Sequence, residues 1–369
     1  MENMKLPLRL THRSTLSSQS GLSLVELMIS LTLGLILMAA LTEAYLASKQ
    51  VQSTDDGLLE LQDSARNAID ILAFDIRGAG FAGCALRGNG QDDQTTSFTD
   101  HTGNLILATD LDNFKANSVQ GFNYSVSAAD WEPALSTDIQ AATAGRLVGN
   151  DILGLYLAEP TDITLNAIAA PEDTSLSLTG DCTEVGDVVL LSNCTRAEIS
   201  TITGAGTCPT LPYTSTIKTN SNGGLEDTYE TDMRLFKFKE VLFYVASTGR
   251  QDASGNAVNA LYRSLNGEPG IELIAGVENM QVLYGQKTGA NNAALRYVSA
   301  NVVGSDWNSV VSVKLSLLIK SDDNALSEID TDSYTVGDVT IGPSTTPSHS
   351  GGRSLRKVYS RTIQIRNRN

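Results

Sequence analysis

The residue with the clearest chemical consequence in this 369-residue chain is Glu26, a carboxylate inside a long apolar run. The run extends from Leu22 to Leu41, and Glu26 is its only charged residue. A carboxylate costs about 2–3 kcal/mol or more inside a bilayer, so a residue of this kind is a functional candidate. In the first turn of a helix, Glu26 is also stabilised by the positive end of the helix dipole.

The position of Glu26 suggests a partner for its charge. Cleavage between Gly21 and Leu22 would create an α-amine four residues before Glu26. This amine is cationic at neutral pH, and it can belong either to the same chain or to a neighbouring subunit. In the second case the buried ion pair would set the register of one subunit against the next.

The apolar run has the length of a membrane span. Twenty helical residues reach about 30 Å, the thickness of the hydrocarbon core. The preceding segment carries Lys5, Arg9 and Arg13, which favours a cytoplasmic N-terminus. An ordinary signal peptide has a shorter apolar region and an A-x-A-like site, and neither occurs here. A plain signal anchor would leave Glu26 unexplained.

The second group of candidate residues is the cysteines. The chain has 4, Cys84, Cys182, Cys194 and Cys208. A head outside the cytoplasm lies where disulfides persist, so we expect two disulfides. Four cysteines allow three pairings, which the sequence does not distinguish. Metal binding is the alternative, but there is no C-x-x-C spacing and no histidine close in sequence.

Composition and motifs favour neither an enzyme nor a cofactor-binding protein. The formal charge of −16 argues against general nucleic-acid binding, and 3 histidines argue against a multi-histidine metal centre. The sequence contains no G-x-S-x-G, P-loop or H-E-x-x-H motif. Asp330 and Asp332 alternate like the start of a calcium loop, but the required glycine and closing glutamate are missing.

The elements around these residues are a long helix and many strands. An apolar stripe continues the helix to about residue 78, and Arg66 and Asp70 on its other face are spaced to form a weak pair. Gly34 and Gly57 are predicted weak points of the helix. The stripe consists of Leu58, Leu61, Ala65, Ile69, Leu72 and Ile76.

Alternation of apolar and polar residues predicts a half-buried strand from Val311 to Ile319, with Leu318 as the exception. Leu235–Val245 also alternates, with a slip near Glu240 that suggests a bulge or a bend. The basic residues from Arg353 to Arg368 predict an edge strand whose charges deter unwanted pairing. Residues 87–150 are predicted to form loops and short strands. Other predicted strands are Asp151–Ala158, Asp187–Leu191, Ile271–Tyr284 and Leu355–Ile365.

The segment SGLSLVELMISLTLGLIL resembles the class III signal of type IV prepilins and type II secretion pseudopilins. The resemblance implies that prepilin peptidase cleaves after Gly21, that Leu22 becomes the N-methylated terminus, and that Glu26 is the assembly glutamate. Leu22 departs from the family, which most often has phenylalanine there.

Four further segments resemble PilW-type minor pilins. They are Phe74–Cys84, Ala260–Gly285, Val310–Ser321 and Ser354–Asn369. The resemblance implies an α+β pilin-like fold, a long N-terminal helix packed on an antiparallel β-rich head. The expected division is a leader at 1–21, a membrane-spanning half-helix at 22–41, an amphipathic half-helix at 42–78 and a head at 79–369.

The resemblance also implies function and partners. It implies a minor pilin in the initiating or tip complex of a type IV pilus, with roles in adhesion and twitching motility. The implied partners are prepilin peptidase, other minor pilins, the major pilin, the inner-membrane assembly platform and a tip adhesin. The implied location is the inner membrane with a periplasmic head, and later the filament. Two alternatives remain, a GspJ-type pseudopilin and a membrane-anchored binding protein that does not polymerise.

Overall fold

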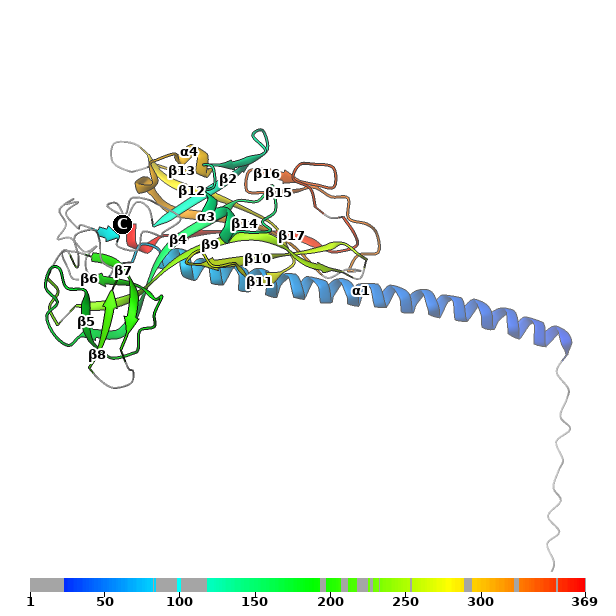
Figure 1. The fold of residues 1–369 in the computed structure, drawn as a ribbon. Helices are drawn as coiled ribbons and strands as arrows, with labels where there is room; N and C mark the ends of the chain where they lie inside the picture. Colours follow the sequence, from blue (N-terminus) through cyan, green and yellow to red (C-terminus); the bar gives the residue numbers. More distant parts are fainter. Residues whose placement is uncertain are drawn as a thin grey trace, which may run out of the picture. The chain divides into compact units, whose positions relative to one another are not determined.

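The protein forms one long helix followed by a β-rich head (Figure 1), and the predicted α+β architecture is confirmed. The chain divides into two compact units, residues 1–52 and 53–369, and helix α1, Leu24–Gly78, contributes to both. The computed structural model describes residues 23–81, 83, 98–100, 118–192, 197–206, 212–217, 225, 228–231, 233–252, 254–288, 294–321, 325–349 and 351–368.

Within the second unit, α1 buries the predicted apolar stripe. Leu61, Leu72 and Ile76 are fully buried in the largest core of the head, and Leu58 is half-buried. The helix ends at Gly78, as the sequence predicts. Asn367 near the C-terminus donates its side-chain amide to the carbonyl oxygens of Gly78, the last helical residue, and Ala79, at 3.3 and 3.1 Å. The first of these bonds satisfies a terminal acceptor of the helix.

Gly57, which the sequence predicts to be a weak point of the helix, is a close-packing position. It lies inside α1 and is buried. A Cβ atom here would lie 2.8 Å from the Cβ of Ala325, a distance that real side chains do not tolerate. Thr54, one turn earlier, donates a 2.7 Å hydrogen bond to the carbonyl of Ala325. Gly57 therefore lets the helix approach the segment that follows β14.

A four-stranded antiparallel sheet carries the C-terminal half of the head. Its order is β13-β12-β14-β17. The strands are β12 (Val277–Thr288), β13 (Ala294–Val298), β14 (Val310–Lys320) and β17 (Arg356–Gln364). The predicted edge position of the basic C-terminal strand, β17, is confirmed. The predicted strand Ile271–Tyr284 is instead two, β11 (Ile271–Ala275) and β12, because Gly276 turns the chain with φ +83°.

Strand β14 alternates as predicted, and the structure explains its one exception. Val313, Leu315, Leu317 and Ile319 are fully buried in the core shared with α1. Leu318 points to the opposite face, where it packs in a small core with the hairpin of β15 (Tyr334–Val336) and β16 (Val339–Ile341). The exception therefore marks a second covered face.

The largest sheet has 11 strands among the described residues. Its strands beyond β11 are β1 (Phe98–Asp100), β2 (Val119–Ser125), β3 (Asp130–Glu132), β4 (Ile152–Leu165), β5 (Ser175–Thr179), β6 (Val188–Ser192), β7 (Ala197–Ala205), β8 (Tyr213–Ile217), β9 (Arg234–Gln251) and β10 (Ala257–Leu265). They include the predicted strands at Asp151–Ala158, Asp187–Leu191 and Leu235–Val245. Short helices are α3 (Thr137–Ala142), α4 (Ala300–Val303), η1 (Trp307–Ser309) and η2 (Arg366–Arg368); α3 lies in a region predicted to contain only loops and short strands.

The bulge predicted near Glu240 is wrong. The register of β9 against β4 runs without a shift from Phe243 to Phe236. The alternation slips because both faces of β9 are covered: Val241 and Phe243 enter the core shared with α1, while Leu242 and Phe238 enter a second core. A strand buried on both faces shows no clean alternation.

Six strands of the larger sheet close into a small barrel. The ring of hydrogen-bonded, antiparallel pairs runs β4-β9-β6-β7-β8-β5 and back to β4. Figure 1 shows β5, β6, β7 and β8 together, in green, at one end of the head. The barrel has its own core, with Leu176, Leu178 and Ile202 fully buried. No local pattern in the sequence predicts this barrel.

Candidate functional site

Glu26 lies in the first turn of α1, with its side chain exposed. The first hydrogen bond of the helix joins the Leu27 N–H to the Ser23 carbonyl at 3.1 Å. A carboxylate at this position faces the unpaired N–H groups of the helix start, which favour negative charge. Gly21 and Leu22, the expected cleavage site and N-terminus, lie outside the described residues.

The N-terminal part of α1 has the surface of a membrane span. The side chains from Leu24 to Leu41 are exposed, and most are large and apolar. Apart from Glu26, the polar side chains in this stretch, Ser30 and Thr32, bond to the helix itself. Ser30 donates to the Glu26 carbonyl at 2.7 Å, and Thr32 donates to Ile29 at 2.9 Å. This internal satisfaction suits a hydrocarbon environment, and α1 is long and apolar enough to cross a membrane.

The C-terminal sheet of the head is tied together by a buried ion-pair network around Arg356. Its guanidinium bonds the Glu278 carboxylate at 2.6 and 3.1 Å and the Asp330 carboxylate at 2.9 Å. It also donates to the Gly351 carbonyl at 2.5 Å. These contacts join strands β12 and β17 to the segments on either side of the β15–β16 hairpin.

Asp330, noted in the sequence as part of a weak calcium pattern, is an ion-pair partner of Arg356. Burial alone would raise the pKa of Asp330, but hydrogen bonds from the Asp332 N–H, Arg356 and the Tyr334 hydroxyl lower it below its usual value. Burial and the Asp330 carboxylate raise the pKa of Tyr334. Among the described residues, no group of three His, Cys, Asp or Glu side chains could hold a metal ion.

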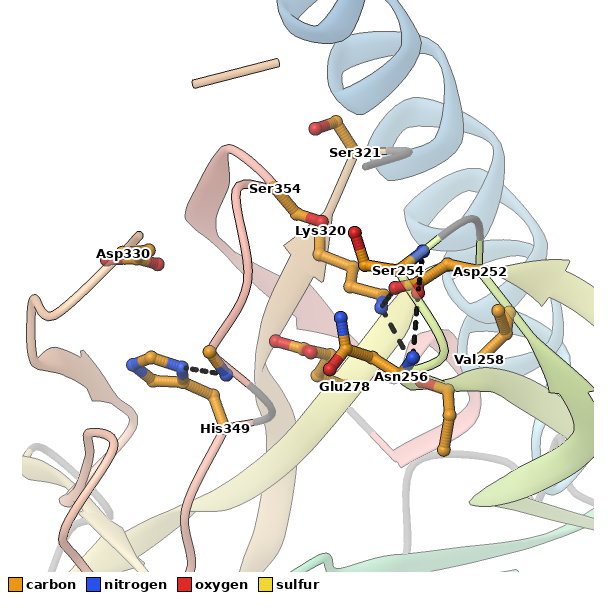
Figure 2. Close-up of polar contacts among 12 residues, drawn as sticks. Asp252, Ser254, Asn256, Val258, Glu278, Lys320, Ser321, Asp330, His349 and Ser354 are labelled. Atoms are coloured by element: carbon orange, nitrogen blue, oxygen red, sulfur yellow. Dashed lines mark hydrogen bonds and ion pairs between the residues drawn. The ribbon is translucent and has the colours of Figure 1, made fainter. Parts of the chain in front are cut away.

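A second buried pair closes the other side of the same region. Lys320, at the end of β14, is 3.1 Å from the Asp252 carboxylate in the β9–β10 turn. Figure 2 shows Lys320 reaching toward Asp252 and Asn256, with Glu278 close by. Asp252 also accepts the backbone N–H groups of Ser254 and Asn256 at 3.1 and 2.8 Å. Burial alone would raise the pKa of Asp252, but hydrogen bonds from Asn256 and the Lys320 ammonium lower it.

Asp151 connects the two sheets. Its carboxylate accepts the N–H of Tyr124 in β2 at 3.0 Å and the N–H of Val282 in β12 at 2.9 Å. Burial raises the pKa of Asp151 to about 7, although the two N–H donors lower it. The adjacent Asn150 accepts the N–H of Met280 in β12 at 2.8 Å. The start of β4 is therefore fixed to the middle of β12.

The C-terminal basic residues are not a uniformly exposed row. Arg356 is buried, so its predicted role as an exposed edge charge is wrong. Arg361 forms an ion pair with Asp70 of α1 at 3.0 Å. Asp70 therefore has a partner on β17, in addition to Arg66, the partner that its spacing in the helix predicts. The charged side chains of β17 therefore bind other parts of the head and also line the edge of the sheet.

The cysteine predictions are tested at one position. Cys182, exposed after β5, is disulfide-bonded. Cys84, Cys194 and Cys208 lie outside the described residues, so the pairing stays a prediction.

Sequence reasoning missed the buried charges, because Lys320, Glu278 and Arg356 were not considered for the core. A signal existed for Lys320, which directly follows the apolar residues that predict β14. Arg356 lies opposite Lys320 only in the register of β14 against β17, which the structure shows. A charged residue at the buried end of a strand needs a partner of opposite charge, and the sequence does not show where that partner lies.

Two family models match the chain. The model for type IV pilus-assembly protein W matches residues 243–367, about a third of the chain. The model for the prokaryotic N-terminal methylation motif matches residues 16–42. No curated protein and no solved structure gives a significant match.

The matched ranges coincide with the features described above. Residues 16–42 include Glu26 and the exposed apolar part of α1. Residues 243–367 include β12, β14 and β17 and both buried ion-pair groups, whereas the barrel strands β5 to β8 lie outside. Both families describe structural, pilin-type proteins. The two matches together confirm the resemblance stated from the sequence, that of a PilW-type minor pilin of type IV pilus assembly.

Proposed function

We propose that this protein is a minor pilin of the complex that initiates a type IV pilus or caps its tip. The observation that carries the proposal is that one chain combines two features. Glu26 lies at the start of an exposed apolar helix, and the C-terminal part of the chain matches the family model for type IV pilus-assembly protein W. In this proposal, prepilin peptidase cleaves after Gly21 and Leu22 becomes the methylated N-terminus.

The mechanism is structural. Leu22–Leu41 crosses the inner membrane, and the head folds in the periplasm. During assembly the apolar helix leaves the lipid and packs against the helices of other minor pilins and the major pilin. Glu26 then neutralises the N-terminal amine of a neighbouring subunit, which replaces an expensive lone charge by an ion pair. The head makes the lateral contacts, and the assembly platform and a tip adhesin complete the set of partners.

The buried ion pairs support this division of roles. They lie in the head and not in the exposed part of α1, and they stabilise the sheet against which the buried part of α1 packs. A head fixed in this way presents a defined surface to the subunits that touch it. Adhesion and twitching motility would follow from the filament and need no chemistry by this chain.

The test is intact-mass analysis of the protein isolated from native membranes. We expect loss of residues 1–21 and the addition of one methyl group at Leu22. A matched sample from cells without prepilin peptidase should keep its full length. An intact Met1 terminus in cells with active peptidase would contradict the proposal. The protein would then be a membrane-anchored head that does not polymerise.

A further inference from the structure

Strand β13 forms one edge of the C-terminal sheet, and among the described residues it pairs only with β12. The opposite edge of this sheet is the basic strand β17. An edge strand presents unpaired backbone N–H and C=O groups that can bind a further strand, unless the protein covers or charges the edge. The function proposed above makes no use of β13.

The protein covers the same edge of the sheet directly beside β13. β12 extends beyond β13, and there the segment before β4 takes the place of a strand. The Asn150 side chain accepts the Met280 N–H at 2.8 Å, and the Met280 carbonyl accepts the Asp151 N–H at 3.0 Å. The Asp151 carboxylate accepts the Val282 N–H at 2.9 Å. β13 is therefore the part of this edge that the described segments leave open.

The direction of these bonds shows which backbone groups of β13 point outward. The two bound N–H groups belong to even-numbered residues of β12, so by alternation the backbone of Tyr284 also faces this side. Tyr284 lies opposite Val298 in the antiparallel register. At such a position both residues direct their N–H and C=O groups toward each other. The backbone groups of Leu295 and Tyr297 consequently point away from the sheet.

The side chains at this open edge are apolar. Leu295 is 49% exposed and Tyr297 is 38% exposed, and both lie on one face of the sheet. A Cβ atom at Gly285 of β12 would lie 3.1 Å from Tyr297 and 3.3 Å from Leu295, so both side chains extend over Gly285. On β17, by contrast, the exposed residues include Lys357 and Arg361. The two edges of one sheet therefore differ, and β13 is the apolar one.

The charged residue of β13, Arg296, does not shield the edge. It lies on the other face of the strand, and its guanidinium donates to the side-chain oxygen of Gln286 on β12 at 3.2 and 2.9 Å. The guanidinium is thus directed back toward the sheet. No carboxylate in the described part of the chain forms an ion pair with Arg296, so its positive charge is available to an acidic side chain on an added strand.

We propose that β13 accepts an extended segment of a partner protein as an additional strand. Apolar side chains of this segment would lie beside Leu295 and Tyr297, and an acidic side chain would lie beside Arg296. The segment would therefore alternate between apolar and acidic residues.

A second copy of this chain fits the edge less well. An antiparallel pair centred on two β13 strands would place Arg296 opposite the same residue of the other copy, and like charges in that position are destabilising. The proposal concerns the head alone. It does not depend on cleavage or polymerisation, so the mass analysis described above does not decide it.

The test is hydrogen exchange, measured by mass spectrometry on the full-length protein in a non-ionic detergent. The probe is the capped peptide Thr-Val-Glu-Val-Glu-Val-Thr. The amides of Leu295 and Tyr297 should exchange fast in the free protein and become protected when the peptide binds. We expect a dissociation constant on the order of a millimolar. No protection at saturating peptide would overturn the proposal.

Two control peptides separate backbone pairing from charge. The same peptide with its central residues N-methylated keeps its side chains but loses its backbone donors, so it should protect neither amide. The peptide with lysine in place of glutamate should bind roughly tenfold more weakly, because its charges repel Arg296. Protection by the N-methylated peptide, or equal binding of the lysine peptide, would overturn the proposal.

Matched variants locate the binding. Leu295→Thr removes apolar contact but keeps a residue that favours strands, and it should weaken the glutamate peptide about threefold. Ile271→Thr makes a similar change at an exposed residue of another edge strand, β11, and should leave binding unchanged. Equal effects of the two variants would overturn the proposal. Protection of β13 that rises with protein concentration in the absence of peptide would also overturn it, since the edge would then bind a second copy.

Discussion

The C-terminal sheet and the barrel belong to the same head but are stabilised in different ways. The sheet of β12, β14 and β17 buries Arg356 with Glu278 and Asp330, and it lies within the PilW match. The barrel closes on itself by backbone hydrogen bonds around an apolar core and lies mostly outside that match. This difference predicts that the two regions can be destabilised separately, although β4 and β9 belong to both.

The largest expected effect is at the ion-pair network. Arg356→Met would leave two buried carboxylates without their cation, which typically costs about 3–5 kcal/mol. Denaturant unfolding of the full-length protein in detergent measures this loss. Arg361→Met, which removes an exposed pair with Asp70, should cost less than about 1 kcal/mol. Equal losses in the two variants would contradict the assignment of the network to the scaffold.

Matched core substitutions test whether the two regions are separate. Leu176→Ala in the barrel and Leu317→Ala in the sheet each remove a fully buried side chain, at a typical cost of about 2–5 kcal/mol. Hydrogen exchange should rise in β5 and β8 for the first and in β12 and β14 for the second. A rise throughout the head in both variants would show one cooperative unit instead.

The connection between the sheets predicts a pH dependence. Asp151 has a pKa of about 7 in the folded protein against 3.8 for the unfolded chain, so the folded state binds its proton more tightly. The free energy of unfolding should therefore fall as pH rises from about 4 to 7, by up to about 1.4 kcal/mol per unit.

The measurement is urea unfolding at several pH values, compared with Asp151→Asn, in which this slope should be reduced. The lowered pKa values of Asp252 and Asp330 act with the opposite sign and in another window. Their stabilisation is present above about pH 4 and is lost as the pH falls further. An unchanged slope in Asp151→Asn would remove Asp151 from the connection.

The sequence predicted the parts of the fold in which one face is buried. The stripe from Leu58 to Ile76 and the alternation of Val313 to Ile319 each identify an element, because a single covered face leaves a clear period. The same reasoning failed at Glu240, where cores on both sides of β9 hide the period. The packing role of Gly57 was not predicted, because it depends on a contact with Ala325, which is far away in the sequence.

The candidate site was predictable to a similar degree. Glu26 stands out because a lone charge in an apolar run has a high energetic cost, which a single sequence reveals. The pairing of Arg356 with Glu278, 78 residues away, depends on which strands become neighbours. The barrel depends on the ring closure between β4 and β5, which no local pattern encodes.

The central claim is that Glu26 acts in assembly, and the direct measurement is filament incorporation of Glu26→Ala beside Glu43→Ala. Both variants change one carboxylate on an exposed part of α1, but only Glu26 lies in its first turn. We predict that both are cleaved after Gly21, that Glu43→Ala enters filaments normally and that Glu26→Ala does so poorly. Normal incorporation of Glu26→Ala would contradict the account.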